Sequence, residues 1–255
     1  MEDFDRAREA GILIPPAPAA APKQRVAFLT YFNDTYKPLA EIALPNFYRY
    51  CKRHGYQLVQ GPYQTDPSDL KTYGDRGKID LFNQIYRDYD IVMFLDIDAL
   101  VMNQSVRIED MLGNLPFLWT YDCNGPCSGF WIARCIADVF LMLNTVRNRA
   151  PEGGGLIARE SAGPPHSVTL SMEPYGTSDQ TMMRRLMNVP PYAEVLQHCY
   201  TGGSCGHTYP RDVMKWPEQY PNINDYEPGA WLVTFPAVPL DQRVKLMREY
   251  AQKAT

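Results

Sequence analysis

Short apolar runs alternate with amphipathic segments along the first part of the chain, and this alternation constrains the fold more than any other feature. Three runs have the length and side chains of strands, namely 25–32, 56–60 and 91–95. Between them lie two segments whose apolar residues recur at helical spacing, 39–55 and 78–89. Strands that alternate with helices predict an α/β fold with a largely parallel sheet. Ligands of such sheets usually bind outside the carboxyl ends of the strands.

Two carboxylates, Asp96 and Asp98, follow the third apolar run directly. If the chain stays extended there, residues two apart lie about 6.6 Å along the strand and project from one face. Both side chains would then converge on one divalent cation, which prefers oxygen ligands. The alternative is a solvated acidic turn, because Asp is common where strands end. The spacing alone leaves both interpretations open.

Composition limits the number of domains and the partners. The chain has 255 residues, 45% of them hydrophobic, which is enough for the core of one large domain. A stretch rich in Pro and Ala at 15–24 is typical of an extended linker. We therefore expect an N-terminal extension over 1–24 and a single domain over 25–255. The formal net charge of -4 argues against a nucleic-acid partner.

The sequence shows no pattern typical of secretion or of membrane insertion. The longest apolar run of the acidic N-terminus is the four residues 11–14, and no other segment approaches the length of a membrane span. We expect a cytoplasmic protein or a soluble domain of a larger one. The six cysteines are then expected to be reduced. Cys123, Cys127 and the segment 198–207 could offer zinc ligands, but their spacing is not the usual CxxC, and ordinary loop cysteines are the favoured interpretation.

Three segments carry recognisable motifs in a fixed order. Residues 76–103 read RGKIDLFNQIYRDYDIVMFLDIDALVMN, a lysine-bearing helix followed by a strand and an acidic DID. Residues 127–146 begin CSGFWIAR, and residues 178–187 read SDQTMMRRLM. Together they resemble the DxD, NxGxFLxRN and DQ or EQ segments of nucleotide-sugar glycosyltransferases of the GT-A fold, especially glycosyltransferase family 34 and its relatives.

The resemblance implies a fold, an activity and a cofactor. The fold would be a Rossmann-like central mixed, mostly parallel sheet flanked by helices. The activity would be transfer of a sugar from a nucleoside diphosphate sugar, either UDP- or GDP-linked, to a glycan or other hydroxyl acceptor, with retention as in the families it resembles. Mn²⁺ or Mg²⁺ would offset the charge of the leaving diphosphate.

The resemblance also implies roles for individual residues. Asp96 and Asp98 would hold the metal, whereas Asp179 and Gln180 would face the reacting sugar. The residues expected to bind the donor are Thr30, Tyr31, Asn33, Arg76, Lys78, Asp96, Ser128 and Gly129.

Structural explanations compete with several of these roles. Tyr31 could pack in the core, and Arg76 and Lys78 could mark a solvated helix start. Asp179 could lie in the first turn of a helix capped by Ser178, where a carboxylate is stabilised by the helix dipole.

The chain departs from the family at the C-terminal strand. The family usually has a histidine there that completes the metal shell, and this chain has Thr234 instead. A hydroxyl is a poorer ligand than an imidazole, although a hard cation can complete its shell with water and diphosphate oxygens. His198 and His207 are possible replacements.

Two other functions remain open on the sequence. A strand followed by DID also resembles the signature of haloacid-dehalogenase-type phosphatases, but that signature stands near the chain start and needs a later acidic pair, which is absent from the sequence. A non-catalytic sugar-binding module derived from the transferase fold is the second alternative, and Thr234 keeps it open.

Overall fold

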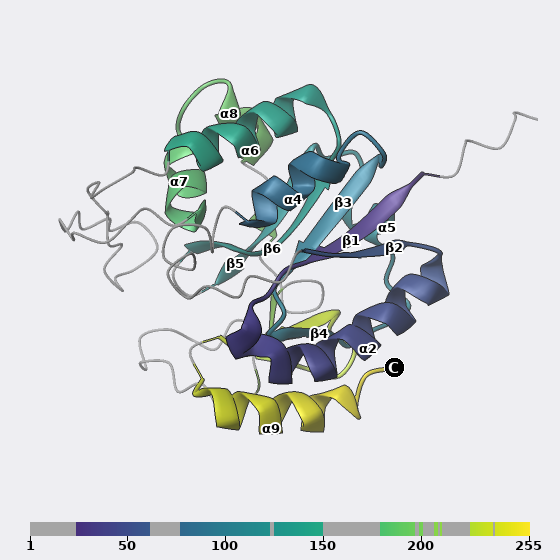
Figure 1. Ribbon diagram of the computed structural model, residues 1–255. Helices are drawn as coiled ribbons and strands as arrows, with labels where there is room; N and C mark the ends of the chain where they lie inside the picture. The colour runs from purple at the N-terminus through teal and green to yellow at the C-terminus, as the bar shows by residue number, and fades with distance from the viewer. Residues whose placement is uncertain are drawn as a thin grey trace, which may run out of the picture.

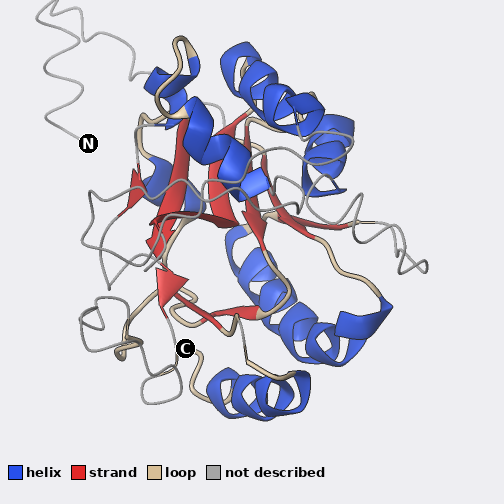
Figure 2. Cartoon of the chain, turned by 90° about the vertical axis from the view of Figure 1, so that its left-hand side faces the viewer, coloured by secondary structure: helices blue, strands red, loops and turns tan. Residues whose placement is uncertain are grey.

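The computed structural model describes residues 24–61, 77–122, 125–149, 179–196, 199–200, 207–208, 210, 225–236 and 238–255. These residues form a central sheet with helices on both faces (Figures 1 and 2). The strands are β1 (Val26–Thr30), β2 (Gln57–Gln60), β3 (Ile91–Leu95), β4 (Ala99–Val101), β5 (Phe117–Asp122), β6 (Gly125–Arg134), β7 (Cys199–Tyr200), β8 (His207–Thr208) and β9 (Leu232–Thr234). The helices are η1 (Asp34–Tyr36), α2 (Lys37–His54), α4 (Gly77–Ile85), α5 (Ile108–Leu112), α6 (Ala137–Arg149), α7 (Asp179–Leu186), α8 (Tyr192–Leu196) and α9 (Leu240–Ala251).

The central sheet is mixed and mostly parallel, which confirms the fold class expected from the sequence. It has six strands in the order β2-β1-β3-β6-β5-β7. β1 is parallel to β2 and β3, and β5 is parallel to β7, whereas β6 is antiparallel to both β3 and β5. Every strand of this sheet except β6 therefore runs in one direction. A smaller sheet has the order β4-β9-β8.

Alternate residues of the central strands face two separate apolar cores. Phe28 and Met93 belong to the core shared with α2, α5 and α9, whereas Leu29 and Phe94 belong to the core under α4, α6, α7 and α8. Figure 1 shows α2 and α9 on one side of the sheet and α4, α6, α7 and α8 on the other. Strands that are apolar on both faces are what a sheet covered on both sides requires. The continuous apolar runs in the sequence arise from this burial.

The predicted elements of the first part of the chain are present, with shifted ends. α2 ends where expected, because Gly55 takes a left-handed conformation with φ 74° and donates its N–H to the Cys51 carbonyl. The first strand stops at Thr30, two residues before the predicted end at 32, since Asn33 caps the short helix η1 and accepts the N–H of Tyr36.

The expectation of an extended chain through Asp96 and Asp98 is wrong. β3 ends at Leu95, the next residues form a turn, and β4 begins at Ala99 in the smaller sheet. The apolar pattern continues unbroken through the two strands, so it conceals the change of sheet. Asp96 and Asp98 therefore lie at the junction of the two sheets, and not on one face of a single strand.

Other expectations are covered only in part by the described residues. Among these residues, no helix is long and apolar enough to cross a membrane. The cysteines whose bonding the structure describes are free thiols, namely Cys51, Cys127 and Cys135. Residues 1–23 of the predicted N-terminal extension and the candidate zinc ligand Cys123 lie outside the described residues. The division of the chain into a linker and one domain stays a prediction.

Candidate functional site

Polar side chains gather at the edge where β1 and β3 end. The Thr30 hydroxyl donates to the Leu95 carbonyl over 2.9 Å, which joins the last residues of the two strands. β6 runs in the opposite direction, so its first half reaches the same edge and Phe130 pairs with Leu95. One residue further out, the Asp96 N–H donates to the Gly129 carbonyl over 2.9 Å. This edge is where the α/β fold predicts a ligand site.

A buried ion pair lies beside this edge. The Lys78 ammonium, from the first turn of α4, is 2.9 Å from Oδ2 of Asp179 at the start of α7. The Ser128 hydroxyl donates to Oδ1 of Asp179 over 3.0 Å, and Lys78 also donates to the Ser128 carbonyl over 3.4 Å. The side chains of Lys78 and Asp179 are only 8% and 5% exposed. The structure therefore brings together three predicted site residues from three separate segments of the chain.

The strand that supplies Ser128 is distorted at this point. β5 and β6 pair at Trp119 and Trp131, and the ladder then resumes at Thr120 and Cys127. Between these two pairs β6 has three extra residues, 128–130, that are not paired with β5. This irregularity is a large β-bulge. Bulges of this kind redirect side chains and are common next to active sites. Here the bulge contains Ser128, whose hydroxyl reaches Asp179.

Gly129 allows Asp96 to approach the strand closely. A Cβ on Gly129 would lie 2.7 Å from Oδ2 of Asp96, closer than non-bonded atoms normally come. Any other residue at position 129 would therefore push the Asp96 carboxylate away. The missing side chain at Gly129 thus leaves the room that the Asp96 carboxylate occupies.

Asp98 has a cationic partner that the sequence did not predict. Nη1 of Arg243, on α9, is 2.9 Å from Oδ2 of Asp98. The exposed fractions of the two side chains are 11% for Arg243 and 17% for Asp98. Burial raises the pKa of the Asp98 carboxyl above its ordinary range, and the Arg243 guanidinium acts against this rise.

Thr234, at the position where the resemblance led us to expect a histidine, lies next to Asp98. β9 pairs Thr234 with Ala99, and the Thr234 hydroxyl is 3.5 Å from the Asp98 carbonyl. The Phe235 N–H donates to the same carbonyl over 2.9 Å. Thr234 is almost fully buried, and its hydroxyl contacts the backbone of the turn at residues 96–98, which we call the acidic turn.

The residues after β1 are held by local contacts. Thr30 is fully buried, and its hydroxyl is engaged with Leu95. The half-buried Tyr31 ring lies against the backbone of Gly61 and Gly77, since a Cβ on either glycine would come within 2.8 Å of the ring. Asn33 is buried as the cap of η1. Their predicted contacts with a nucleotide stay predictions.

Four of the residues singled out in the sequence are covered incompletely. Arg76 and His198 lie outside the described residues, and the side chains of Gln180 and His207 are not described either. Gln180 lies in the first turn of α7, directly after Asp179.

The carboxylate oxygens of Asp96 and Asp98 are of the chemical kind that hard divalent cations bind. Within the described part of the chain, no group of three or more His, Cys, Asp or Glu side chains is placed to hold an ion. A carboxylate offers about four lone-pair sites, so the contact with Arg243 leaves Asp98 capacity for a further ligand. Mn²⁺ or Mg²⁺ held by Asp96 and Asp98 would complete its shell with water and diphosphate oxygens.

Arg243 is the main residue that the sequence reasoning missed. Its signal was an arginine on the inward face of a helix: Arg243, Met247 and Tyr250 recur at helical spacing and all three are buried. A buried arginine needs an acidic partner, so this pattern could have predicted a contact with a carboxylate.

No family model and no curated protein matches the chain. A solved structure of a glycosyltransferase involved in the glycosylation of the major capsid of PBCV-1 is similar to it, with a TM-score of 0.55 and 14% identity over 88% of this chain and 99% of that one. The galactosyltransferase LgtC, solved with donor and acceptor sugar analogs, has a TM-score of 0.45 and 13% identity over 90% of this chain and 96% of that one. The bifunctional glycosyltransferase WbbM has a TM-score of 0.46 and 10% identity over 91% of this chain and 52% of that one.

The likeness to the capsid glycosyltransferase concerns the fold, because at 14% identity nothing further follows from it. The two structures with TM-scores below 0.5 add nothing to this conclusion. The chain therefore has the GT-A type α/β fold expected from the sequence.

Proposed function

We propose that the protein is a metal-dependent glycosyltransferase that moves a sugar from a UDP- or GDP-sugar to a glycan or other hydroxyl acceptor, with retention of configuration. The observation that carries the proposal is the buried pair of Lys78 and Asp179, 2.9 Å apart, beside the carboxyl edge of β1 and β3. Ser128 joins this pair to the strand that contacts the acidic turn. The fold shared with a glycosyltransferase agrees with the proposal.

The donor would lie across this edge of the sheet. Tyr31 and Asn33, which follow β1, would contact the base and ribose, and Arg76 would contact the phosphates. Ser128 and Gly129 would lie beside the sugar. Fully buried Thr30 would support these residues through its bond to Leu95.

The chemistry requires opposite charges at two places. Asp96 and Asp98 would hold Mn²⁺ or Mg²⁺, which supplies Lewis acidity for the departing diphosphate. Asp179 would present its negative charge to the sugar as the sugar becomes cationic, and a fixed charge of this kind lowers the barrier without reorganisation. Lys78 and Ser128 hold the Asp179 carboxylate in one orientation, and Gln180 would contact the same sugar.

A screen of UDP- and GDP-sugars for Mn²⁺-dependent release of the nucleoside diphosphate tests the proposal. We expect release from one donor class, its loss on Asp96→Asn, and an α- or β-linkage in the product that matches the donor. Asp241→Asn is the matched control, because it removes one carboxylate from an exposed position at the start of α9.

Two results would replace the proposal. Hydrolysis of a simple phosphate ester, lost on Asp96→Asn, would indicate a phosphatase. Binding of a nucleotide sugar without transfer or hydrolysis would indicate a non-catalytic module. Of these two alternatives, the pairing of Asp98 with Arg243, together with a threonine at position 234, favours the non-catalytic module over the phosphatase.

A further inference from the structure

We propose that Arg243 is a positioning residue of the donor site, which holds the Asp98 carboxylate and couples it to the turn after β1. The inference rests on the proposed function, because it gives the acidic turn a ligand to bind. Arg243 itself would touch neither sugar nor diphosphate.

The Arg243 guanidinium is held in place by contacts other than the one with Asp98. Its Nε and Nη2 donate to the Val238 carbonyl over 3.1 and 2.8 Å, which leaves Nη1 to bond Oδ2 of Asp98 over 2.9 Å. A planar group held at two nitrogens presents the third in one direction only. Arg243 therefore determines where one oxygen of Asp98 lies.

The same C-terminal segment also holds the backbone of Asp98. The Phe235 N–H and the Thr234 hydroxyl both approach the Asp98 carbonyl, at 2.9 and 3.5 Å. Side chain and backbone of this one residue are thus fixed from a segment more than 130 positions away in sequence. A solvated acidic turn would not need such contacts.

Arg243 also connects Asp98 to the turn after β1, where the base and ribose of the donor are expected to bind. Its guanidinium carbon lies 5.7 Å from the centre of the Tyr36 ring, and the Tyr36 N–H donates to the side chain of Asn33. Asn33 is the residue expected to contact the ribose. One arginine therefore packs between the turn that follows β1 and the turn that follows β3.

The contact leaves Asp98 accessible to a ligand. Asp98 keeps 17% of its side chain exposed, more than the 11% of Arg243. Residues that orient a metal-binding carboxylate typically change metal affinity by about 10- to 100-fold when they are removed. The expected effect of losing Arg243 is of that size.

Calorimetry of UDP and of GDP, each with Mn²⁺, tests the inference on the full chain. Arg243→Gln should weaken Mn²⁺-dependent nucleotide binding by about 10-fold or more, and Arg243→Lys, which keeps the charge without the planar fork, by about threefold. Arg248→Gln is the control, because it removes the same charge from an exposed position of the same helix and should leave the affinity unchanged. Arg243→Gln should add no further loss to Asp98→Asn, since it acts through Asp98.

Three outcomes would overturn it. Wild-type affinity in Arg243→Gln would remove the positioning role, and so would an equal loss in the wild-type and Asp98→Asn backgrounds. If Arg243→Gln does not fold, wild-type affinity in Arg243→Lys decides against the role. Failure of the wild type to bind either nucleotide is a different result, because it removes the proposed function together with this inference.

Discussion

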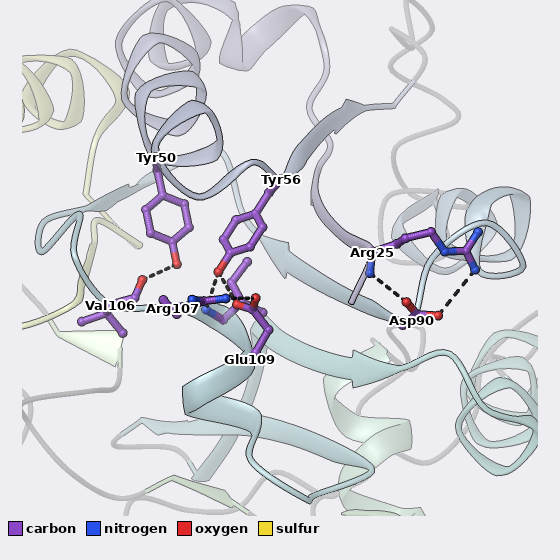
Figure 3. Close-up of polar contacts among 8 residues, drawn as sticks. Arg25, Tyr50, Tyr56, Asp90, Val106, Arg107 and Glu109 are labelled. Carbon is purple, nitrogen blue, oxygen red and sulfur yellow. Dashed lines mark hydrogen bonds and ion pairs between the residues drawn. The ribbon is translucent and has the colours of Figure 1, made fainter. Parts of the chain in front are cut away.

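An ion pair lies at each end of the parallel strands, and the two pairs differ in how far their side chains are exposed. At the start of β1 and β3, Arg25 and Asp90 form an ion pair at 3.4 Å whose side chains are 60% and 44% exposed (Figure 3). At the other end, Lys78 and Asp179 form a pair at 2.9 Å with 8% and 5% exposed. Exposed pairs contribute about 0–1 kcal/mol, whereas breaking a buried pair costs about 3–5 kcal/mol. Only the second pair is therefore expected to be expensive to alter.

A third acidic group, away from the site, shows how the fold satisfies a partly buried carboxylate by other means. Glu109 accepts a hydrogen bond from the Tyr56 hydroxyl and another from Arg107, as Figure 3 shows. Burial raises the pKa of Tyr56, which keeps the hydroxyl protonated as a donor. The partners of Glu109 are thus a neutral donor and an exposed cation. This partly buried carboxylate is therefore satisfied without a buried lysine beside it.

The largest effect is expected from Lys78→Met. It leaves the Asp179 carboxylate buried without its cation, so the free energy of unfolding should fall by about 3–5 kcal/mol. Urea denaturation measures it. Arg25→Met at the other end of the strands is the matched control and should change the free energy by about 1 kcal/mol or less.

A double variant sharpens this result. Lys78→Met combined with Asp179→Leu removes both charges, and the loss should then be largely recovered, because apolar replacements of buried pairs are often neutral or stabilising. If Lys78→Met is as mild as Arg25→Met, the two ends of the sheet do not differ as we describe.

Asp179→Asn should lower the free energy of unfolding as Lys78→Met does, because it leaves the Lys78 ammonium buried without its anion, and in addition it should slow catalysis. It removes the charge that faces the sugar in the proposed mechanism, so turnover should fall by about 100-fold, or about 2.7 kcal/mol in barrier, with nucleotide diphosphate affinity nearly unchanged. Turnover, affinity and melting temperature are measured on the same protein. A variant that melts earlier but transfers sugar at the wild-type rate would give Asp179 a structural role only.

Gly129→Ala should weaken Mn²⁺-dependent UDP or GDP binding by about 10-fold, or about 1.4 kcal/mol. The added Cβ would lie 2.7 Å from Oδ2 of Asp96, so the carboxylate must move. Gly113→Ala is the control: its φ of 55° makes alanine strained, yet nothing lies within 4 Å of the new Cβ. That variant should lose stability and keep its affinity, and equal affinities in both variants would contradict the role of Gly129.

The sequence predicted the elements of the fold because their residues act locally. Gly55 ends a helix through its own backbone conformation, and the strand residues Leu29 and Phe94 are apolar because the sheet buries both faces. The motifs also predicted that Lys78, Ser128 and Asp179 belong to one site. Their actual contacts depend on a bulge in β6 that no local pattern marks.

The acidic turn was predicted less well because its geometry is set from a distance. The apolar pattern runs on from β3 into β4, so the turn between Asp96 and Asp98 is invisible in it. The partner of Asp98 comes from α9, and an arginine among apolar residues indicates that a partner exists without naming it. Long-range pairing of this kind needs the folded chain.

The smallest effect, and the one that completes the comparison, is expected from Asp90→Asn. The backbone N–H of Arg25 donates to Oδ2 of Asp90 over 2.7 Å and is the main reason that the pKa of Asp90 is lowered. A carboxyl whose pKa is lowered by folding stabilises the protein above its unfolded pKa of about 3.9 and loses that contribution as the pH falls through the folded value. The variant should therefore be less stable by a few tenths to about 1 kcal/mol at neutral pH, and the difference should shrink below about pH 4. Urea midpoints of both proteins at the two pH values measure this, and a difference that grows toward acid would show that the exposed end of the sheet depends on something other than the Asp90 charge.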